Sequence, residues 1–260
     1  MLLCTIFILS LFYKLYKNIY HHISNNMLEE VFHYSITGLY LTLCFFSYYF
    51  PYKVPKIDKD KIKKFCLFHN LFLITWNSYI FLNICYNVYD KKLTFFGNEP
   101  NDTSNVLLNR LMYHFWISKY YDYVDTAIII LKGNYHQMSF LHVFHHSSVS
   151  TIMYYNYKLI PYGGDIWFLI FYNSFIHIIL YYYYLITSLK TNTVVWWSKY
   201  LTTFQIIQFV CGNVQQIGSI IVNKNYPQYI REINTLYSTY MLYLFVSFYI
   251  KRYNKNKKIV

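Results

Sequence analysis

Charged side chains are scarce in this chain. They make up 13% of its 260 residues, while apolar residues make up 56% and the mean hydropathy is +0.20. Soluble domains carry about 25% charged residues, so this composition excludes an ordinary soluble fold and is typical of a membrane protein. Glycine and proline are also rare, with 7 and 5 residues. The sequence contains no internal repeat, linker or low-complexity segment, so we expect residues 1–260 to form a single domain.

Cysteine is equally sparse. The five cysteines are odd in number, dispersed, and lie within or beside apolar stretches. This pattern predicts neither a disulfide framework nor a cysteine-based metal site. Acidic residues number 11 against 23 lysines and arginines, which gives a formal net charge of +12. The cations concentrate in the segments between apolar windows, and no folded basic domain is present, so we expect no nucleic acid partner.

Seven apolar windows are long enough to cross a bilayer, which requires about 20 helical residues. The composition and these windows predict an all-α, polytopic membrane protein whose seven transmembrane helices form one bundle. The windows span about residues 31–50, 65–86, 111–131, 138–156, 166–187, 200–222 and 233–250.

The first thirty residues precede these windows. Residues 1–13 are apolar but short, no basic region precedes them, and Lys14 and Lys17 follow. This pattern differs from a cleavable signal peptide. We therefore expect residues 1–30 to be an N-terminal extension with an interfacial segment, and an eighth crossing remains the alternative.

The lysines and arginines predict an orientation. If the first span starts in the lumen, the cytosolic segments hold 14 of the 23 and the lumenal segments hold 8, in agreement with the positive-inside rule. The sequon Asn101–Thr103 falls in a predicted lumenal loop. Residues 251–260 form a basic cytosolic tail, and Lys257 and Lys258 match a dilysine signal for the endoplasmic reticulum membrane; contact with anionic headgroups is the alternative interpretation.

Three histidines stand out in the fourth window. His142, His145 and His146 are spaced i, i+3 and i+4, so they share one face of a helix. Imidazoles are costly among lipid tails, and packing alone does not explain three of them on one face. The spacing therefore predicts a reactive site within the membrane.

Further polar residues recur on single faces of three other windows. At about 1.5 Å of rise per residue, these groups and the histidines lie about 6–15 Å from the cytosolic side. An internal ion pair would also explain the lysine and the two aspartates, and an aromatic belt would explain the tyrosines. The stripes are Lys119, Asp122, Asp125 and Thr126; Asn173, His177, Tyr181 and Tyr184; and Thr202, Gln205 and Gln208.

Four motifs in this order resemble those of the ELO family of very-long-chain fatty acid elongases. Two positions depart from the family pattern: Asp122 stands where Glu is usual, and Leu180 where Met is usual. The match covers the chain from about residue 31 to its end. The motifs are Lys-x-x-Asp-x-x-Asp-Thr at 119–126, the histidine box at 142–146 preceded by Gln137, the segment from Asn173 to Tyr184, and Thr-x-x-Gln-x-x-Gln at 202–208.

The resemblance implies condensation of acyl-CoA with malonyl-CoA to 3-oxoacyl-CoA, CoA and CO2, with no cofactor and no metal. It implies His145 as the nucleophile that forms an acyl-imidazole, with His177 as its closest partner. His142 and His146 would orient or polarise the substrates. Asp122 and Asp125 would fix histidine tautomers, and Lys119 would neutralise these two carboxylates. Gln205 and Gln208 would donate to carbonyl oxygens. Gln137, Asn173 and Tyr181 complete the supporting set.

In this interpretation the acyl chain lies in an apolar tunnel that runs toward the lumen, and CoA stays at the basic cytosolic mouth. The remaining partners would be membrane lipid and the 3-oxoacyl-CoA reductase, dehydratase and enoyl-CoA reductase of the elongation cycle.

Two alternatives remain. A membrane di-iron desaturase or hydroxylase also uses H-x-x-H-H, but it needs several such boxes, and the other histidines, including His33 and His69, are scattered in depth or lie outside the windows. We therefore assign no function to His33 or His69. The second alternative is a transporter or receptor with a buried proton relay or ligand site.

Overall fold

The computed structural model describes residues 27–51, 57–189, 197–222 and 225–254. Within these ranges the chain is helical and contains no strand, which confirms the all-α fold. The α-helices are α2 (Met27–Tyr49), α3 (Lys59–Lys91), α4 (Val106–Tyr121), α5 (Tyr123–Leu131), α6 (Phe140–Leu159), α7 (Trp167–Ser188), α8 (Ser198–Val222) and α9 (Gln228–Asn254), and the 3-10 helices are η2 (Tyr135–Gln137) and η3 (Gly164–Ile166).

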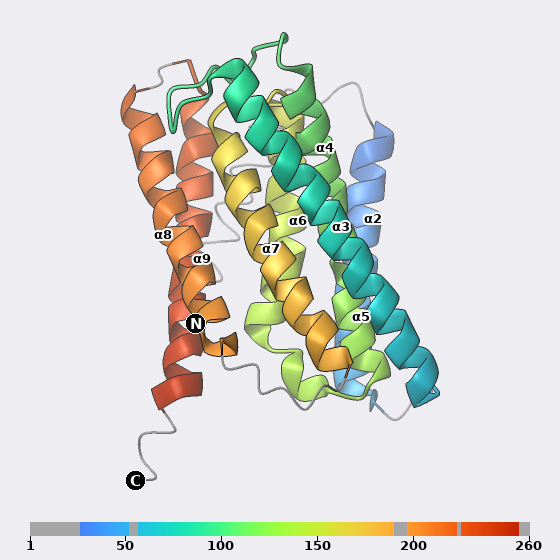
Figure 1. Ribbon diagram of the computed structural model, residues 1–260. Coiled ribbons are helices and arrows are strands. Elements are labelled where there is room, and N and C mark those ends of the chain that lie inside the picture. Colours follow the sequence, from blue (N-terminus) through green and yellow to red (C-terminus); the bar gives the residue numbers. More distant parts are fainter. Residues whose placement is uncertain (1–26, 52–56, 190–196, 223–224, 255–260) are drawn as a thin grey trace.

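The helices form one elongated bundle (Figure 1). Helices α8 and α9 pack side by side on one flank, and α7 joins them to α3, its principal neighbour. Helix α6 lies behind α7 and contacts α2, α4 and α9. The end of α5, the start of α6 and the end of α7 all lie at the lower end of the bundle in this view. The segments with the predicted site residues therefore meet at one end.

Each predicted window overlaps a helix, but the bounds differ. Helix α3 begins at Lys59, six residues before its window, and the third window is divided into α4 and α5 at Asp122. Helix α2 begins at Met27, so 27–30 belong to the first helix and not to an extension. The interfacial segment predicted for the rest of the N-terminus, and the dilysine sequence, lie outside the described residues.

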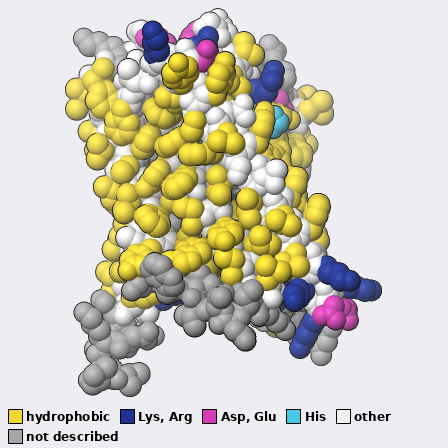
Figure 2. Space-filling model, viewed as in Figure 1, with side chains coloured by type: hydrophobic (Ala, Val, Ile, Leu, Met, Phe, Trp, Pro, Cys, Tyr) yellow, Lys and Arg dark blue, Asp and Glu magenta, His cyan; other side chains and the backbone are white. Residues whose placement is uncertain are grey.

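Among the described residues, α3 and the segment Gly164–Ser188 are long and apolar enough to cross a membrane. Buried polar side chains lower the mean hydropathy of the other helices; α6, for example, carries the three histidines. Figure 2 shows a face with apolar side chains over most of its height and charged side chains gathered toward its two ends. Helix α8 also presents exposed apolar residues at helical spacing, among them Phe204, Ile207, Val210 and Val214. This surface favours contact with lipid.

Local capping fixes the start of α6. Ser139 is the N-cap residue, and its side-chain oxygen accepts a hydrogen bond from the backbone N–H of His142 at 3.2 Å. Such a cap satisfies one of the donors that a helix leaves free at its first turn. The histidine box therefore occupies the first two turns of α6.

A polar network holds the opposite end of the bundle. The buried Asp165 carboxylate accepts hydrogen bonds from the backbone N–H groups of Gly97 and Asn98 and from the Ser219 hydroxyl. The Gln215 side chain donates to the Asp165 carbonyl at 2.7 Å. These bonds tie the loop after α3 to η3 and α8. These hydrogen bonds hold the end of the bundle that is opposite the histidine box.

Candidate active site

Lys119 and Asp122 form a buried ion pair at the junction of α4 and α5. The Lys119 ammonium donates to Asp122 Oδ2 at 3.1 Å and to Asn173 Oδ1 at 3.1 Å. The side chains of Lys119 and Asp122 are each 2% exposed. The same ammonium lies 4.4 Å from the centre of the Phe115 ring. A buried charge is tolerated when it is paired and hydrogen-bonded, and these contacts meet both conditions.

Tyr181 connects the two aspartates. Its hydroxyl lies 2.7 Å from Asp125 Oδ2 and 3.2 Å from Asp122 Oδ1. A phenol carries one proton, so it donates to one carboxylate at a time. Tyr181 lies on α7 two turns from Asn173, so both contacts on the Lys119 cluster come from one face of that helix. The helix break at Asp122 and the face of α7 together assemble the cluster.

His177 faces the same cluster. Its Nδ1 lies 3.9 Å from Asp122 Oδ2, which is within ion-pair range but too long for a hydrogen bond. The ring is buried and close enough to interact electrostatically with Lys119 and His145. The structure therefore brings His177 and the histidine box to the same buried region.

The histidine box lies on the side of α6 that faces this cluster. His145 is half-buried, its Nδ1 has no hydrogen-bond partner among the residues that the structure describes, and its ring centre lies 5.5 Å from that of His146. His142 Nε2 lies 2.8 Å from Thr126 Oγ1, which in turn contacts the Tyr40 hydroxyl at 3.2 Å. The box is thus anchored to α5 and α2 through His142, while His145 keeps an unengaged ring nitrogen.

The Asp125 carboxylate contacts a histidine outside the box. We expected the aspartates to fix histidine tautomers, and the hydrogen bonds of the Asp125 side chain go to Tyr181 and His69. His142 is held by a threonine hydroxyl instead. Helix α5 turns the Asp125 side chain toward α3 and α7 and the Thr126 side chain toward α6, because neighbouring residues on a helix point about 100° apart.

His69 is a site residue that the sequence interpretation missed. Its side chain is fully buried, its Nε2 lies 2.8 Å from Asp125 Oδ1, and its ring stacks on Tyr121. The predicted window began at residue 65, which placed His69 about 6 Å deep, within the layer of the other polar residues. It is the one histidine in its window, so no spacing pattern distinguished it from a buried structural residue.

Three predicted residues stay apart from this cluster. Gln137 is exposed on η2, Gln205 is half-buried and Gln208 is buried on α8. Across the part of the chain that the structure describes, no hydrogen bond links these side chains to Lys119, Asp122 or the histidines. Within the same residues, no three His, Cys, Asp or Glu side chains are close enough to hold a metal ion.

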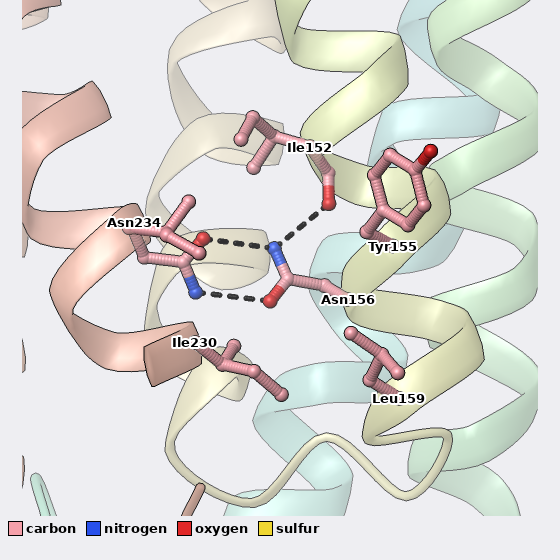
Figure 3. A pocket seen from close by; sticks show the side chains of 7 residues that line it. Ile152, Tyr155, Asn156, Leu159, Ile230 and Asn234 are labelled. Atoms are coloured by element: carbon pink, nitrogen blue, oxygen red, sulfur yellow. Dashed lines mark hydrogen bonds between the residues drawn. The ribbon is translucent and has the colours of Figure 1, made fainter. Parts of the chain in front are cut away.

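A small pocket lies farther along α6, on the side that faces α9 (Figure 3). Asn156 and Asn234 form two reciprocal amide hydrogen bonds of 3.1 and 2.9 Å across it, among apolar side chains. Asn156 lies eleven residues after His145, about 16 Å along the same helical face. The pocket therefore lies on the same helical face as His145, farther along α6.

The chain matches the family model described as ELO: GNS1/SUR4 family over residues 25–259. It is 31% identical to human very long chain fatty acid elongase 5 over 208 residues, which are 77% of this chain and 69% of that protein. It is 28% identical to very long chain fatty acid elongase 4 of Mus musculus over 233 residues, which are 86% of this chain and 72% of that protein. The extent of these matches shows that the chain belongs to the ELO (GNS1/SUR4) family.

Proposed function

We propose that this protein is a membrane-embedded fatty acid elongase that condenses acyl-CoA with malonyl-CoA to give 3-oxoacyl-CoA, CoA and CO2. The observation that carries the proposal is the position of the half-buried His145 and the buried His177, from two different helices, beside the Lys119–Asp122 ion pair. The elongase names of the relatives indicate the chemical class. No cofactor is required, since both substrates are activated thioesters.

The first step is acyl transfer to His145. A ring nitrogen of His145 attacks the acyl-CoA carbonyl, a carbon–nitrogen bond forms, the carbon–sulfur bond breaks, and the CoA thiolate takes the proton that the imidazole loses. The free Nδ1 of His145 supports this role, because no intramolecular hydrogen bond has to be broken first. Covalent catalysis of this kind divides one difficult condensation into two easier steps.

The second step forms the new carbon–carbon bond. Malonyl-CoA loses CO2, the electron pair of the broken bond attacks the acyl carbon, the carbon–nitrogen bond to His145 breaks, and the departing imidazole takes up a proton that comes from solvent, which regenerates neutral His145. His177 is placed to exchange a proton with the reacting groups, and Asp122 at 3.9 Å is placed to stabilise its charged form. His142 and His146 would orient the substrates, Asn173 would hold Lys119, and Gln137, Gln205 and Gln208 would contact the CoA or carbonyl groups outside the buried cluster.

The location follows from the same assignment. We infer that residues 1–260 form one ELO-type domain that crosses the endoplasmic reticulum membrane seven times, with α4 and α5 as one interrupted crossing. The N-terminus would be lumenal and the C-terminus cytosolic, so the histidine box lies toward the cytosol, where CoA is available. The acyl chain would run in a tunnel along α6 toward the Asn156–Asn234 pocket. The reductases and dehydratase of the elongation cycle would act on the product.

The test is an assay of membranes that contain the full chain. They are incubated with labelled malonyl-CoA and acyl-CoAs of graded length, and we expect products two carbons longer. The His145→Ala protein should reach the membrane in normal amount and extend no substrate. Absence of extension by the wild-type protein with every acyl-CoA would overturn the proposal, and stoichiometric iron in the purified protein would favour the desaturase alternative. Proton-coupled uptake without malonyl-CoA turnover would favour the transporter alternative.

A further inference from the structure

His69 lies on α3, which carries none of the four family motifs, yet it contacts the motif carboxylate Asp125. The two side chains are 0% and 16% exposed, and their Nε2 and Oδ1 atoms are 2.8 Å apart. An ionised carboxylate can only accept, so His69 Nε2 carries the proton of this hydrogen bond. His69 Nδ1 is buried and has no hydrogen-bond partner among the described residues. The Nε2 contact with Asp125 is therefore the hydrogen bond that orients the ring.

The contact begins a continuous series of hydrogen bonds. Asp125 accepts from His69 on one oxygen and from Tyr181 on the other, and the Tyr181 hydroxyl also lies 3.2 Å from Asp122. Asp122 then pairs with Lys119 and faces His177. A carboxylate that is hydrogen-bonded at both oxygens keeps one orientation. The Tyr181 hydroxyl, which lies between the two aspartates, then keeps a fixed position as well. Displacement of Asp125 would therefore displace the groups around His177.

The other polar contacts point the same way. Lys119 donates to Asp122 and Asn173, so it does not hold Asp125. Among the residues that the structure describes, His69 and Tyr181 are the side chains that hydrogen-bond the Asp125 carboxylate. Because an unpaired buried carboxylate is costly, removal of His69 would favour movement of Asp125 toward water or toward Tyr181 alone.

We propose that His69 is a positioning residue of the elongase site, which holds Asp125, and through Tyr181 also Asp122, in the orientation that His177 requires. This inference rests on the proposed function. Its rival is a purely structural role, in which the imidazole fills the contact of α3 with α5 and α7 by stacking on Tyr121 at a ring distance of 5.4 Å. Both roles predict that a large change at residue 69 is harmful, so the experiment must separate them.

The variants His69→Gln and His69→Asn separate the positioning role from the structural role. The amide nitrogen of glutamine takes the place of Nε2, whereas that of asparagine takes the place of Nδ1 and falls short of Asp125. Both variants are polar, uncharged and smaller than histidine. We expect His69→Gln to retain kcat within about threefold of wild type and His69→Asn to lose about tenfold to a hundredfold in kcat, with the KM for malonyl-CoA little changed. Equal kcat values for the two variants would overturn the proposal.

A double-variant comparison gives a second readout. If His69 acts through Asp125, then His69→Asn should lower kcat little further in an Asp125→Asn protein, because the group that it positions is already changed. Full multiplication of the two losses would contradict the proposal. Protein amount and thermal unfolding in detergent are measured for every variant, so that a loss of folding is seen directly.

His33 provides a matched control. It is 1% exposed and makes one hydrogen bond through a ring nitrogen, to the Tyr120 hydroxyl at 2.7 Å, but it lies on α2 outside the carboxylate cluster. We expect His33→Gln, which removes the ring nitrogen Nδ1 that bonds Tyr120, to lower the unfolding temperature and leave kcat of the folded protein unchanged. An equal kcat loss in His69→Asn and His33→Gln would indicate general destabilisation and overturn the role of His69. If the wild-type chain extends no substrate, the proposed function itself fails, whereas an active wild type with an active His69→Asn variant refutes this inference alone.

Discussion

The Tyr181 hydroxyl lies 2.7 Å from Oδ2 of Asp125, a contact that joins the middle of α7 to the first turn of α5. The two residues are 56 positions apart in the sequence. They belong to different family motifs, and their contact shows that these motifs build one continuous polar cluster. This cluster, His145 and the Asn156–Asn234 pair give rise to four predictions.

Tyr181→Phe removes the hydroxyl that lies between the two aspartates and leaves the aromatic volume in place. We expect kcat to fall about tenfold to a hundredfold, because the aspartates lose the hydroxyl that links them, while protein amount stays near wild type. Acyl-CoA extension assays on purified protein give the comparison. Tyr226→Phe is the control, since it removes a buried hydroxyl that donates to the Gly163 carbonyl at 3.3 Å, away from the cluster. Equal activity of the two variants would count against the cluster.

Lys119→Met leaves Asp122 buried without its cation. Removal of one partner of a buried ion pair costs about 3–5 kcal/mol, so we expect a marked decrease in folded protein. The double variant Lys119→Met/Asp122→Asn removes the charge of both partners and should recover most of the lost stability. Thermal unfolding of detergent-solubilised protein measures both. A double variant no more stable than Lys119→Met would show that the ion pair is not the source of the loss.

The acyl intermediate should be trapped on His145. Protein incubated with acyl-CoA and no malonyl-CoA is expected to gain the mass of one acyl group, and hydroxylamine should remove it. Peptide mass spectrometry locates the adduct. His136→Ala serves as a control at an exposed histidine on η2, and the adduct should persist in that variant. An adduct at another residue would transfer the nucleophile role to that residue.

The amide pair Asn156 and Asn234 should limit the length of the product. The pair crosses the pocket between α6 and α9, so Asn156→Ala/Asn234→Ala would remove both amides and lengthen an apolar tunnel without leaving one amide unpaired. We expect the longest product to gain at least two carbons in a chain-length panel. Asn77→Ala is the control, because this buried asparagine on α3 bonds only the Leu73 carbonyl in the same helix. An unchanged product profile would place the end of the tunnel elsewhere.

Much of this site was predictable from the sequence. The spacing of His142, His145 and His146 requires a shared face on any helix, and the same holds for Asn173, His177 and Tyr181. The inference of shared faces succeeded because helical periodicity is local and depends only on positions along one segment.

The contacts between segments required the tertiary structure. Asp125 bonds His69 rather than a box histidine, and Gln205 and Gln208 remain outside the hydrogen-bonded cluster. Both outcomes depend on how far each helix is rotated about its axis, which decides the neighbour that a side chain such as His69 faces. By itself the sequence determined which residues share a helical face and which family the motifs resemble. The packing of the helices decided which of those faces meet, because side-chain pairs across a bundle depend on rotation and register that no single segment encodes.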